Sequence, residues 1–335
     1  LKGLHIKLFA SIIFLSIAVC QDDVSEGTAS VTKVATSAAN WLKIESGARG
    51  ISMGGSQVAS GRGIAGAYYN PASIAFIKSS ETYFSKSAYL AGITHNTIGY
   101  GTRLTPTDYF GIHLFYLDSG EMEVTTVPSP DGTGEYFNVL DISLRLIYGK
   151  QLTDRLRIGG AIKYIREQIY TMNMQSFVFD LGSNFDTGIY GMILGMSISN
   201  FGPEVQFHGE GLEVVVSDTT ARDGKLAKIT KKFSVPLTFR LGLQKDIFGN
   251  EESANYLTVS MDAINPIDYT MYYSIGLEYS WAKLAFIRAG SRLSHDTAGI
   301  SLGGGIKLRG IMVDYAYVDY GILTETHQFG ISLDF

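Results

Sequence analysis

The chain has 335 residues, with 27 Lys and Arg against 32 Asp and Glu and a formal net charge of −5. Charged residues make up only 18% of it, whereas a soluble domain usually carries about a quarter. The acidic excess argues against nucleic acid as a partner, because phosphate binding needs a basic face. The single cysteine excludes an internal disulfide or a thiolate metal site.

Residues 1–20 have the pattern of a secretory signal peptide. Lys2, His5 and Lys7 form a basic start, and an apolar run follows up to Val19. About a dozen apolar residues are too few for a transmembrane helix, which needs about 20. Cleavage ahead of residue 21 would remove Cys20. A lipoprotein acylated on Cys20 stays open as the alternative, although Val19 is bulkier than the residue usually found there.

A Gly-rich block occupies residues 47–80, after a lead-in of Ser, Thr and Ala in residues 21–46 that we expect in the periplasm. Glycines at this density permit close backbone packing and positive φ angles. They favour a compact plug segment over a regular helix or strand. The candidate plug residues are Gly47, Arg49, Met53, Gly54, Gly55, Asn70 and Pro71.

Residues 81–335 alternate with period two, which predicts antiparallel strands with two different faces. Leu144 and Leu146 share one face, for example, and Ser143 and Arg145 share the other. Fourteen strands of about ten residues suit a closed bacterial barrel, which has an even strand number and no unpaired edge. The expected strands are 81–90, 95–104, 109–118, 138–149, 156–168, 175–185, 190–200, 234–245, 255–264, 270–281, 283–291, 297–308, 311–319 and 325–335.

The expected connections alternate in length along the chain. Residues 105–108, 151–154 and 309–310 are short turns, whereas 119–137 and 201–233 are long and fall on the opposite side. Long loops on one side are typical of outer-membrane barrels, in which that side is extracellular. Only the connection 246–254 is longer than this pattern predicts, since a tight turn is expected there.

A soluble β-sandwich is the alternative architecture, because alternation occurs in any half-buried sheet. Its outer faces would carry charge, whereas here the apolar face carries Tyr, Phe and Trp and the other carries Gly, Ser and Thr. The sequence therefore predicts an all-β, transmembrane antiparallel β-barrel of about 14 strands with an N-terminal Gly-rich plug segment. We expect it in the outer membrane of a Gram-negative-type bacterium.

Few residues have a pattern that indicates chemistry. Residues 61–66 match G-x-G-x-x-G, but that motif binds dinucleotides only inside a βαβ unit, which the alternating sequence does not predict. No two histidines of the mature chain have metal-binding spacing. His113 would need a Ser and an orienting acid to serve a hydrolase. The sequence therefore predicts no catalytic residue, no metal and no cofactor.

Charged residues on the predicted lumen face have mixed signs. They favour ion pairs that hold lumen and plug together, and a conduction path is the alternative. The loop 201–233 is charged and long, and it is the expected place for partner recognition. The predicted lumen-facing polar residues are Asp141, Arg145, Asp180, Arg240, Glu278, Lys307 and Asp314.

The plug block and the C-terminus resemble the PorV/PorQ family of FadL-like outer-membrane transport barrels. The resemblance rests on Gly47-Ala48-Arg49, Met53-Gly54-Gly55 and Tyr69-Asn70-Pro71-Ala72, followed by about fourteen strands. Gly330, Leu333 and Phe335 resemble the C-terminal signal read by the barrel-assembly machinery. The chain departs from the family where Ser60-Gly61-Arg62-Gly63 replaces residues that are commonly acidic.

The resemblance implies a non-enzymatic barrel in contact with outer-membrane lipid. A PorV-like member would bind exported proteins and a secretion translocon in type IX secretion or surface attachment, which is the leading hypothesis from the sequence. A FadL-like member would instead pass hydrophobic small molecules such as fatty acids. A barrel hydrolase is the third and least favoured hypothesis.

Overall fold

A computed structural model describes residues 34, 36–216, 224–297 and 299–335, so the expected signal peptide lies outside the described residues. Antiparallel strands dominate this part of the chain, and its helices are short. None of the helices described is both long enough and apolar enough to pass through a bilayer.

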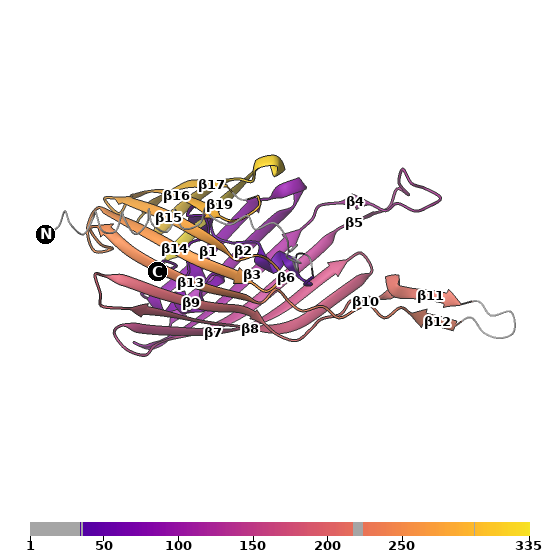
Figure 1. The fold of residues 1–335 in the computed structure, drawn as a ribbon, viewed down its shortest axis with the longest axis horizontal. Coiled ribbons are helices and arrows are strands. Elements are labelled where there is room, and N and C mark those ends of the chain that lie inside the picture. The colour runs from indigo at the N-terminus through magenta and orange to yellow at the C-terminus, as the bar shows by residue number, and fades with distance from the viewer. Residues whose placement is uncertain (1–33, 35, 217–223, 298) are drawn as a thin grey trace, which may run out of the picture. The chain divides into compact units, whose positions relative to one another are not determined.

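Fourteen of the described strands close into one antiparallel barrel, which confirms the fold predicted from the sequence (Figure 1). Each strand pairs with the next barrel strand along the chain, and the first and last pair with each other to complete the ring. The strands are β1 (Ser80–Ala88), β2 (Thr94–Arg103), β3 (Asp108–Asp118), β6 (Val139–Gln151), β7 (Leu156–Ile169), β8 (Met172–Asp186), β9 (Met192–Phe201), β13 (Thr238–Phe248), β14 (Tyr256–Pro266), β15 (Tyr272–Trp281), β16 (Ala285–Leu293), β17 (Ile300–Leu308), β18 (Ile311–Asp319) and β19 (Glu325–Asp334).

The outer face of the barrel is apolar, as the alternation predicts. On β17, Ile306 is 66% exposed while Ser301 is 3% exposed. On β15, Leu277 points outward and Glu278 is buried. An outward band of aliphatic and aromatic side chains can be solvated by lipid, and the closed ring leaves no unpaired strand edge for lipid to meet.

The two ends of the barrel differ. Short connections join strands at one end, here called the short-turn end: residues 104–107, 152–155, 187–191, 249–255, 282–284 and 309–310. The opposite, long-loop end carries residues 119–138 and 202–237. Two hairpins extend from it, one made by β4 (Met122–Glu123) and β5 (Tyr136–Phe137), the other by β11 (Glu213–Val216) and β12 (Gly224–Ala227) (Figure 1). The short strand β10 (His208–Gly209) pairs with β8.

The starts of β13 and β9 differ from the prediction for identifiable reasons. We expected a strand at 234–245, but β13 begins at Thr238 because Pro236 has no N–H to donate to a ladder. At its other end β13 runs on to Phe248 through a register shift. We expected a strand from 190, but Tyr190 and Gly191 have φ of 52° and 69° and form the turn before β9.

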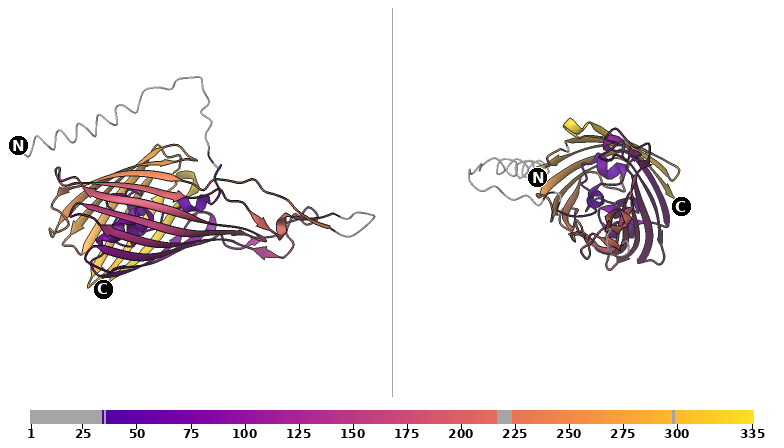
Figure 2. Two further views of the ribbon diagram at one scale, coloured as in Figure 1. Left: turned by 90° about the horizontal axis from the view of Figure 1, so that it is seen from below. Right: turned by 90° about the vertical axis from the view of Figure 1, so that its right-hand side faces the viewer.

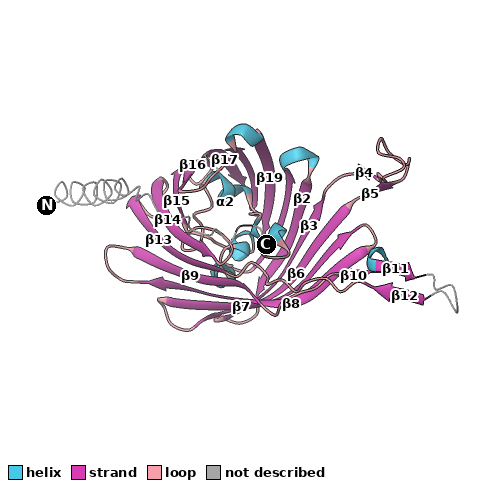
Figure 3. Cartoon of the chain, turned by 45° about the vertical axis from the view of Figure 1, so that its right-hand side comes forward, coloured by secondary structure: helices cyan, strands magenta, loops and turns pink. Residues whose placement is uncertain are grey.

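Residues 36–79, here called the inner segment, run inside the barrel (Figures 2 and 3). The segment contains the short helices η2 (Asn40–Lys43), α2 (Ala48–Ser52), η3 (Ala65–Tyr68) and η4 (Pro71–Phe76). Helix α2 packs on β16 to β19, and η4 packs on β2, β3 and β6 to β8. Of the lead-in expected at 21–46, residues 38–42 pack near the long-loop end, and residues 21–33 and 35 are not among those described.

Candidate functional site

The inner wall carries a ring of buried ionisable side chains, here called the charged belt. Eight strands contribute one residue each, and every member is at most 9% exposed. Neighbouring strands place members side by side: Arg145 lies across from Lys163, and Glu278 across from Arg288. The belt consists of Arg145, Lys163, Asp180, Arg240, Asp262, Glu278, Arg288 and Asp314.

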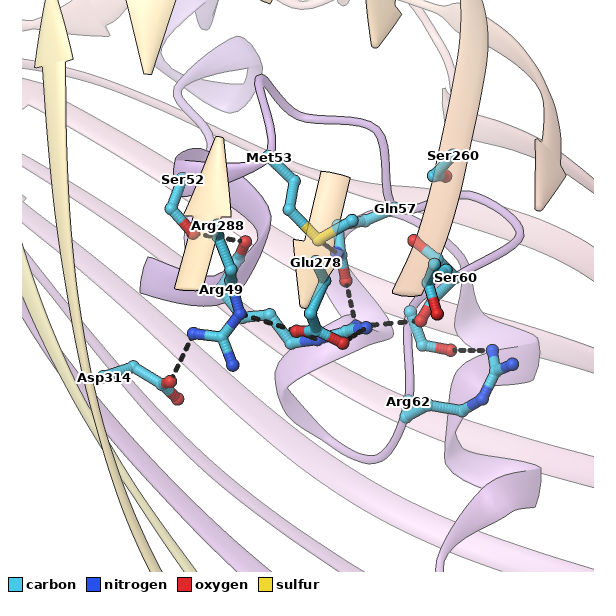
Figure 4. Close-up of polar contacts among 12 residues, drawn as sticks. Arg49, Ser52, Met53, Gln57, Ser60, Arg62, Ser260, Glu278, Arg288 and Asp314 are labelled. Atoms are coloured by element: carbon cyan, nitrogen blue, oxygen red, sulfur yellow. Dashed lines mark hydrogen bonds and ion pairs between the residues drawn. The ribbon is translucent and has the colours of Figure 1, made fainter. Parts of the chain in front are cut away.

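On one half of the belt, Arg49 of α2 anchors the inner segment to the wall (Figure 4). Its Nε and Nη2 donate to the two Glu278 carboxylate oxygens at 2.8 and 2.9 Å. Arg288 donates to the same carboxylate at 2.6 Å and to Asp314 at 2.6 Å. Arg49 Nη1 also donates to Gln57 Oε1 at 2.9 Å, so one guanidinium joins wall and segment. Breaking a buried pair of this kind leaves an uncompensated charge, which costs about 3–5 kcal/mol.

On the other half of the belt, Asp180 forms ion pairs with two cations. Arg145 Nε and Lys163 Nζ lie 3.1 Å from its carboxylate oxygens. Arg145 also donates to the Ala67 carbonyl at 2.8 Å, which ties η3 to the wall. The guanidinium carbons of Arg145 and Arg240 lie 5.9 and 5.8 Å from the centroid of the Tyr68 ring. Both halves of the belt thus bind the inner segment.

Between the belt contacts, glycines of the wall allow the inner segment to touch the strands directly. A Cβ on Gly290 would lie 2.1 Å from the Met53 carbonyl carbon, and one on Gly182 would lie 2.0 Å from Asn70 Oδ1. These distances are far below van der Waals contact, so the wall and the segment fit only because those side chains are missing. A Cβ would likewise come within 3.0 Å of the inner segment at Gly99, Gly101, Gly111, Gly149, Gly159, Gly195, Gly242, Gly276 and Gly303.

The residues predicted for the plug all lie in the inner segment. Asn70 caps η4, because its Oδ1 accepts from the Ala72 amide at 3.0 Å. Its Nδ2 donates to the Val58 and Ser183 carbonyls at 2.8 and 3.0 Å, joining two parts of the segment to β8. Pro71 occupies the first turn of η4, where a missing N–H costs nothing. The remaining predicted residues, Gly47, Arg49, Met53, Gly54 and Gly55, lie in or beside α2, and the three glycines have φ of 108°, 66° and 86°.

Of the seven lumen residues predicted from the sequence, five are in the charged belt: Arg145, Asp180, Arg240, Glu278 and Asp314. Asp141 is buried nearer the long-loop end, directly across from Glu167. Lys307 is at the short-turn end and pairs with Asp334 at 2.6 Å. The belt residues that the prediction omitted are Lys163, Asp262 and Arg288. Each is a charge between two apolar residues of a strand, and this pattern could have identified it.

A cavity of about 750 Å³ opens at the short-turn end and reaches Arg49, Glu278 and Arg288. Its lining is mixed. Apolar side chains include Phe76, Ile77, Tyr83, Phe286 and Met312, and charged ones include Lys283, Lys307, Arg309 and Asp334. The cavity can therefore hold a molecule with an apolar body, and the inner segment forms its inner end.

The lumen near the long-loop end is filled by an apolar cluster. Trp41 and Leu42 of η2 pack with Phe115, Val178 and Val205. Trp41 stacks on Phe115 with ring centroids 5.9 Å apart and donates its Nε1 to Glu167 at 3.2 Å. A cavity of about 10 Å³, the size of one water, lies beside Trp41, Leu42 and Phe115. Apolar packing around Trp41 thus fills the lumen near the long-loop end.

The described residues contain no group of His, Cys, Asp and Glu that could hold a metal ion. His113 is 2% exposed, and its Nε2 has no hydrogen-bond partner in the described part of the chain. Ser143 lines the same small cavity, but no hydrogen bond is found between it and His113. The hydrolase hypothesis therefore gains no support from this geometry. Residues 61–66 lie in the inner segment with no strand before them among the described residues, so they do not form a dinucleotide site.

The residues of the expected assembly signal lie at the end of the barrel. Gly330 and Leu333 belong to β19, and Phe335 follows it with 72% of its surface exposed. Gly330 pairs with Ser85 of β1, so the signal lies beside the closing strand pair.

Many solved structures have a similar fold, among them the following three. The Pseudomonas putida toluene transporter TodX is 14% identical with a TM-score of 0.58, over 86% of this chain and 96% of that chain. The CymD monoaromatic hydrocarbon channel is 12% identical with a TM-score of 0.55, over 86% and 96%. A Pseudomonas aeruginosa FadL homologue is 12% identical with a TM-score of 0.53, over 87% and 98%. No family model matches the chain, and no curated protein matches it. The chain has a FadL-like barrel fold.

Proposed function

We propose that this barrel is a passive outer-membrane transporter for hydrophobic small molecules, with the inner segment as its plug. The observation that carries the proposal is the 750 Å³ cavity, which runs from the short-turn end to the Arg49–Glu278 pair and has apolar side chains along its wall. Beyond that pair the lumen is closed by the inner segment. Movement of this segment would join the cavity to the long-loop end.

The similar solved structures favour this proposal over protein secretion. Two of them are described as a toluene transporter and a monoaromatic hydrocarbon channel. The described part of this chain has the same fold and encloses a cavity of suitable size for a small molecule of that kind. The proposed substrate class, hydrophobic molecules such as aromatic hydrocarbons or fatty acids, is supported by the apolar side chains within the mixed lining, such as Phe76, Phe286 and Met312.

Flux into proteoliposomes tests the proposal. Liposomes that contain the purified barrel are expected to take up radiolabelled toluene and a long-chain fatty acid faster than protein-free liposomes, after subtraction of passive diffusion. Arg49→Met is expected to increase uptake, because it removes the anchor of α2. Lys307→Met removes a half-exposed ion pair of the same cavity and serves as the control. Uptake equal to that of protein-free liposomes for both compounds refutes the proposal.

Protein secretion remains the second candidate, because two hairpins extend beyond the barrel at the long-loop end (Figure 1). Val127, between β4 and β5, is 98% exposed, and Ile229, in the loop after β12, is 90% exposed. Such side chains suit contact with another protein. A pull-down from native membranes that recovers translocon subunits or exported cargo supports this function, and deletion of residues 124–135 is expected to abolish that recovery.

For assembly, we propose export through residues 1–20 and recognition of Gly330, Leu333 and Phe335 by the barrel-assembly machinery. The expected result of Phe335→Ala is accumulation of unfolded chain in the periplasm, detected by loss of heat-modifiable migration in gels. Normal amounts of folded barrel in the outer membrane would contradict this role.

A further inference from the structure

Two arginines meet on one phenylalanine near the short-turn end of the lumen. The Arg62 guanidinium carbon lies 4.1 Å from the centroid of the Phe76 ring, and that of Arg157 lies 4.3 Å from the same centroid. Arg62 and Phe76 come from the inner segment, whereas Arg157 comes from β7. The ring thus holds two like charges close together in a half-buried position.

The two arginines differ in their partners. Arg62 donates to Glu251, to Gln244 and to the carbonyls of Ala59 and Gly61 at 2.9 to 3.1 Å, so its donors are largely used. Arg157 has no ion pair and no hydrogen-bond acceptor among the described residues, and its Nε is buried. A guanidinium normally satisfies its five donors with oxygen atoms. Arg157 therefore lacks acceptors.

Asn184, the neighbour of Arg157 on β8, also lacks a hydrogen-bond acceptor within the residues described. Asn184 lies directly across from Arg157, and both side chains are on the inner face. Asn184 is 1% exposed, and its Nδ2 has no acceptor in the described part of the chain. The amide orientation is fixed by Asn70: Asn70 Oδ1 accepts from Ala72, so Asn70 Nδ2 must donate, and Asn184 turns its Oδ1 toward it at 3.4 Å.

The charges around this pair favour an anion. Two guanidinium groups face a single paired carboxylate, that of Glu251, which is 52% exposed and therefore screened by water. Asp186, two residues beyond Asn184 on the same face, accepts from the Gly188 amide at 2.8 Å and forms no ion pair with Arg157. All the unfilled groups are donors, so the complementary ligand is an acceptor with negative charge.

We propose that Arg157 and Asn184 form a binding site for an oxyanion, a carboxylate or a phosphate group, at the short-turn end of the lumen. Arg157 supplies the charge and a two-pronged donor, and Asn184 supplies a second donor. Arg62 adds positive potential, and Phe76 keeps the Arg157 guanidinium in place. Arg62 and Phe76 also line the 750 Å³ cavity, so the site lies beside it. This site does not depend on the transport function proposed above.

Calorimetric titration of the detergent-purified full chain tests the site, with four probes: inorganic phosphate, acetate, hexyl phosphate and hexanoate. Saturable binding of at least one probe is expected, with no binding of hexylammonium. Arg157→Gln is expected to weaken it at least tenfold. Asn184→Asp, which keeps the shape and adds a carboxylate opposite Arg157, is expected to abolish it. Arg155→Gln, an exposed arginine of the adjacent turn, is the matched control and is expected to stay within twofold of the wild type.

The probes distinguish the two sources of the oxyanion. Equal affinity for phosphate and hexyl phosphate indicates a free ion, and tighter binding of the alkyl compounds indicates a headgroup whose chain enters the cavity; either result supports the site. The site is refuted by absence of saturable binding, by unchanged affinity in Arg157→Gln, or by equal losses in Arg155→Gln. Heat-modifiable migration verifies folding. If Arg157→Gln fails to fold, Arg157→Lys replaces it, with an expected loss of at least threefold; unchanged affinity in that variant counts equally against the site.

Discussion

The fit between the wall glycines and the inner segment can be tested on one strand. Gly159 and Gly160 are adjacent on β7, and their missing side chains point to opposite faces. A Cβ on Gly159 would lie 2.4 Å from the Pro71 carbonyl carbon and 2.5 Å from the Ala72 nitrogen. A Cβ on Gly160 would meet nothing closer than the end of Leu181, at 3.6 Å. Gly159→Ala and Gly160→Ala are therefore matched variants that differ only in the face they crowd.

The magnitude follows from what must move. The atoms that Gly159→Ala would crowd belong to the backbone at the start of η4, so no side-chain rotation can relieve the contact. Relief requires the inner segment to shift by roughly 1 Å, and overpacking of this kind costs about 1–3 kcal/mol. That energy converts to a decrease of about 5- to 150-fold in the equilibrium constant for docking of the segment. Gly160→Ala is expected to change this constant less than twofold.

Hydrogen–deuterium exchange of the detergent-purified chain measures the docking equilibrium directly. Amide protection of residues 65–76 is expected to fall by the factor above in Gly159→Ala and to stay unchanged in Gly160→Ala. Amide protection in the barrel strands β15 to β18 is expected to stay the same in both variants, because these strands lie several pairings away from β7, on which Pro71 packs. Equal protection of residues 65–76 in the two variants would refute the claim that the wall glycines seat the segment.

Three further outcomes are expected. Arg49→Met should lower the free energy of unfolding by roughly 2–4 kcal/mol, below the cost of about 3–5 kcal/mol for a fully broken buried pair, because the Glu278 carboxylate loses Arg49 but keeps Arg288. Lys307→Met should lower it by less than about 1 kcal/mol, because its ion pair is half exposed. Urea midpoints compare the two variants, and equal shifts contradict the argument. Trp41→Ala should lower the free energy of unfolding by about 3–5 kcal/mol, because it removes a buried ring of the apolar cluster, and it should raise the conductance of the barrel in planar bilayers. An unchanged conductance would mean that the apolar cluster does not close the lumen. Burial lowers the pKa of His295, a loop residue, so the folded state binds fewer protons than the unfolded state as pH falls below about 6.5. The free energy of unfolding should therefore decrease below that pH. An NMR titration that gives His295 a pKa at or above about 6.5 would contradict this prediction.

The strands could be predicted because a closed barrel imposes the same alternation on every one of them. On β15, the sequence places Leu277 outward and Glu278 inward, and the structure agrees. The predicted start of β13 was wrong because the apolar alternation continues through Val235, whereas the missing N–H of Pro236 ends the hydrogen-bonded ladder. The short strands in the long loops escaped prediction because they consist of two to four residues, too few to show any period.

The candidate site could be predicted only in part. Alternate residues of a strand face the lumen, so the inward position of Arg145, Glu278 and Asp314 could be predicted from the sequence. Which of them meet depends on strand register, and register is not readable from one sequence. The contact of both Arg62 and Arg157 with the Phe76 ring likewise depends on tertiary structure, because the three residues are far apart in the sequence. A lumen glycine gives no signal of what approaches it, so the close fit to the segment became evident only in three dimensions.

The pairing of β1 with β19 has a consequence for how the protein is made. The segment that fills the interior leads directly into the first strand, yet α2 rests on the last four strands to be synthesised. Its seat is therefore incomplete until residues 285–334 have arrived, so docking of α2 and pairing of β1 with β19 both wait for the end of synthesis. Defects in residues 47–55 should accordingly surface as late failures of biogenesis, in chains whose strands are individually sound.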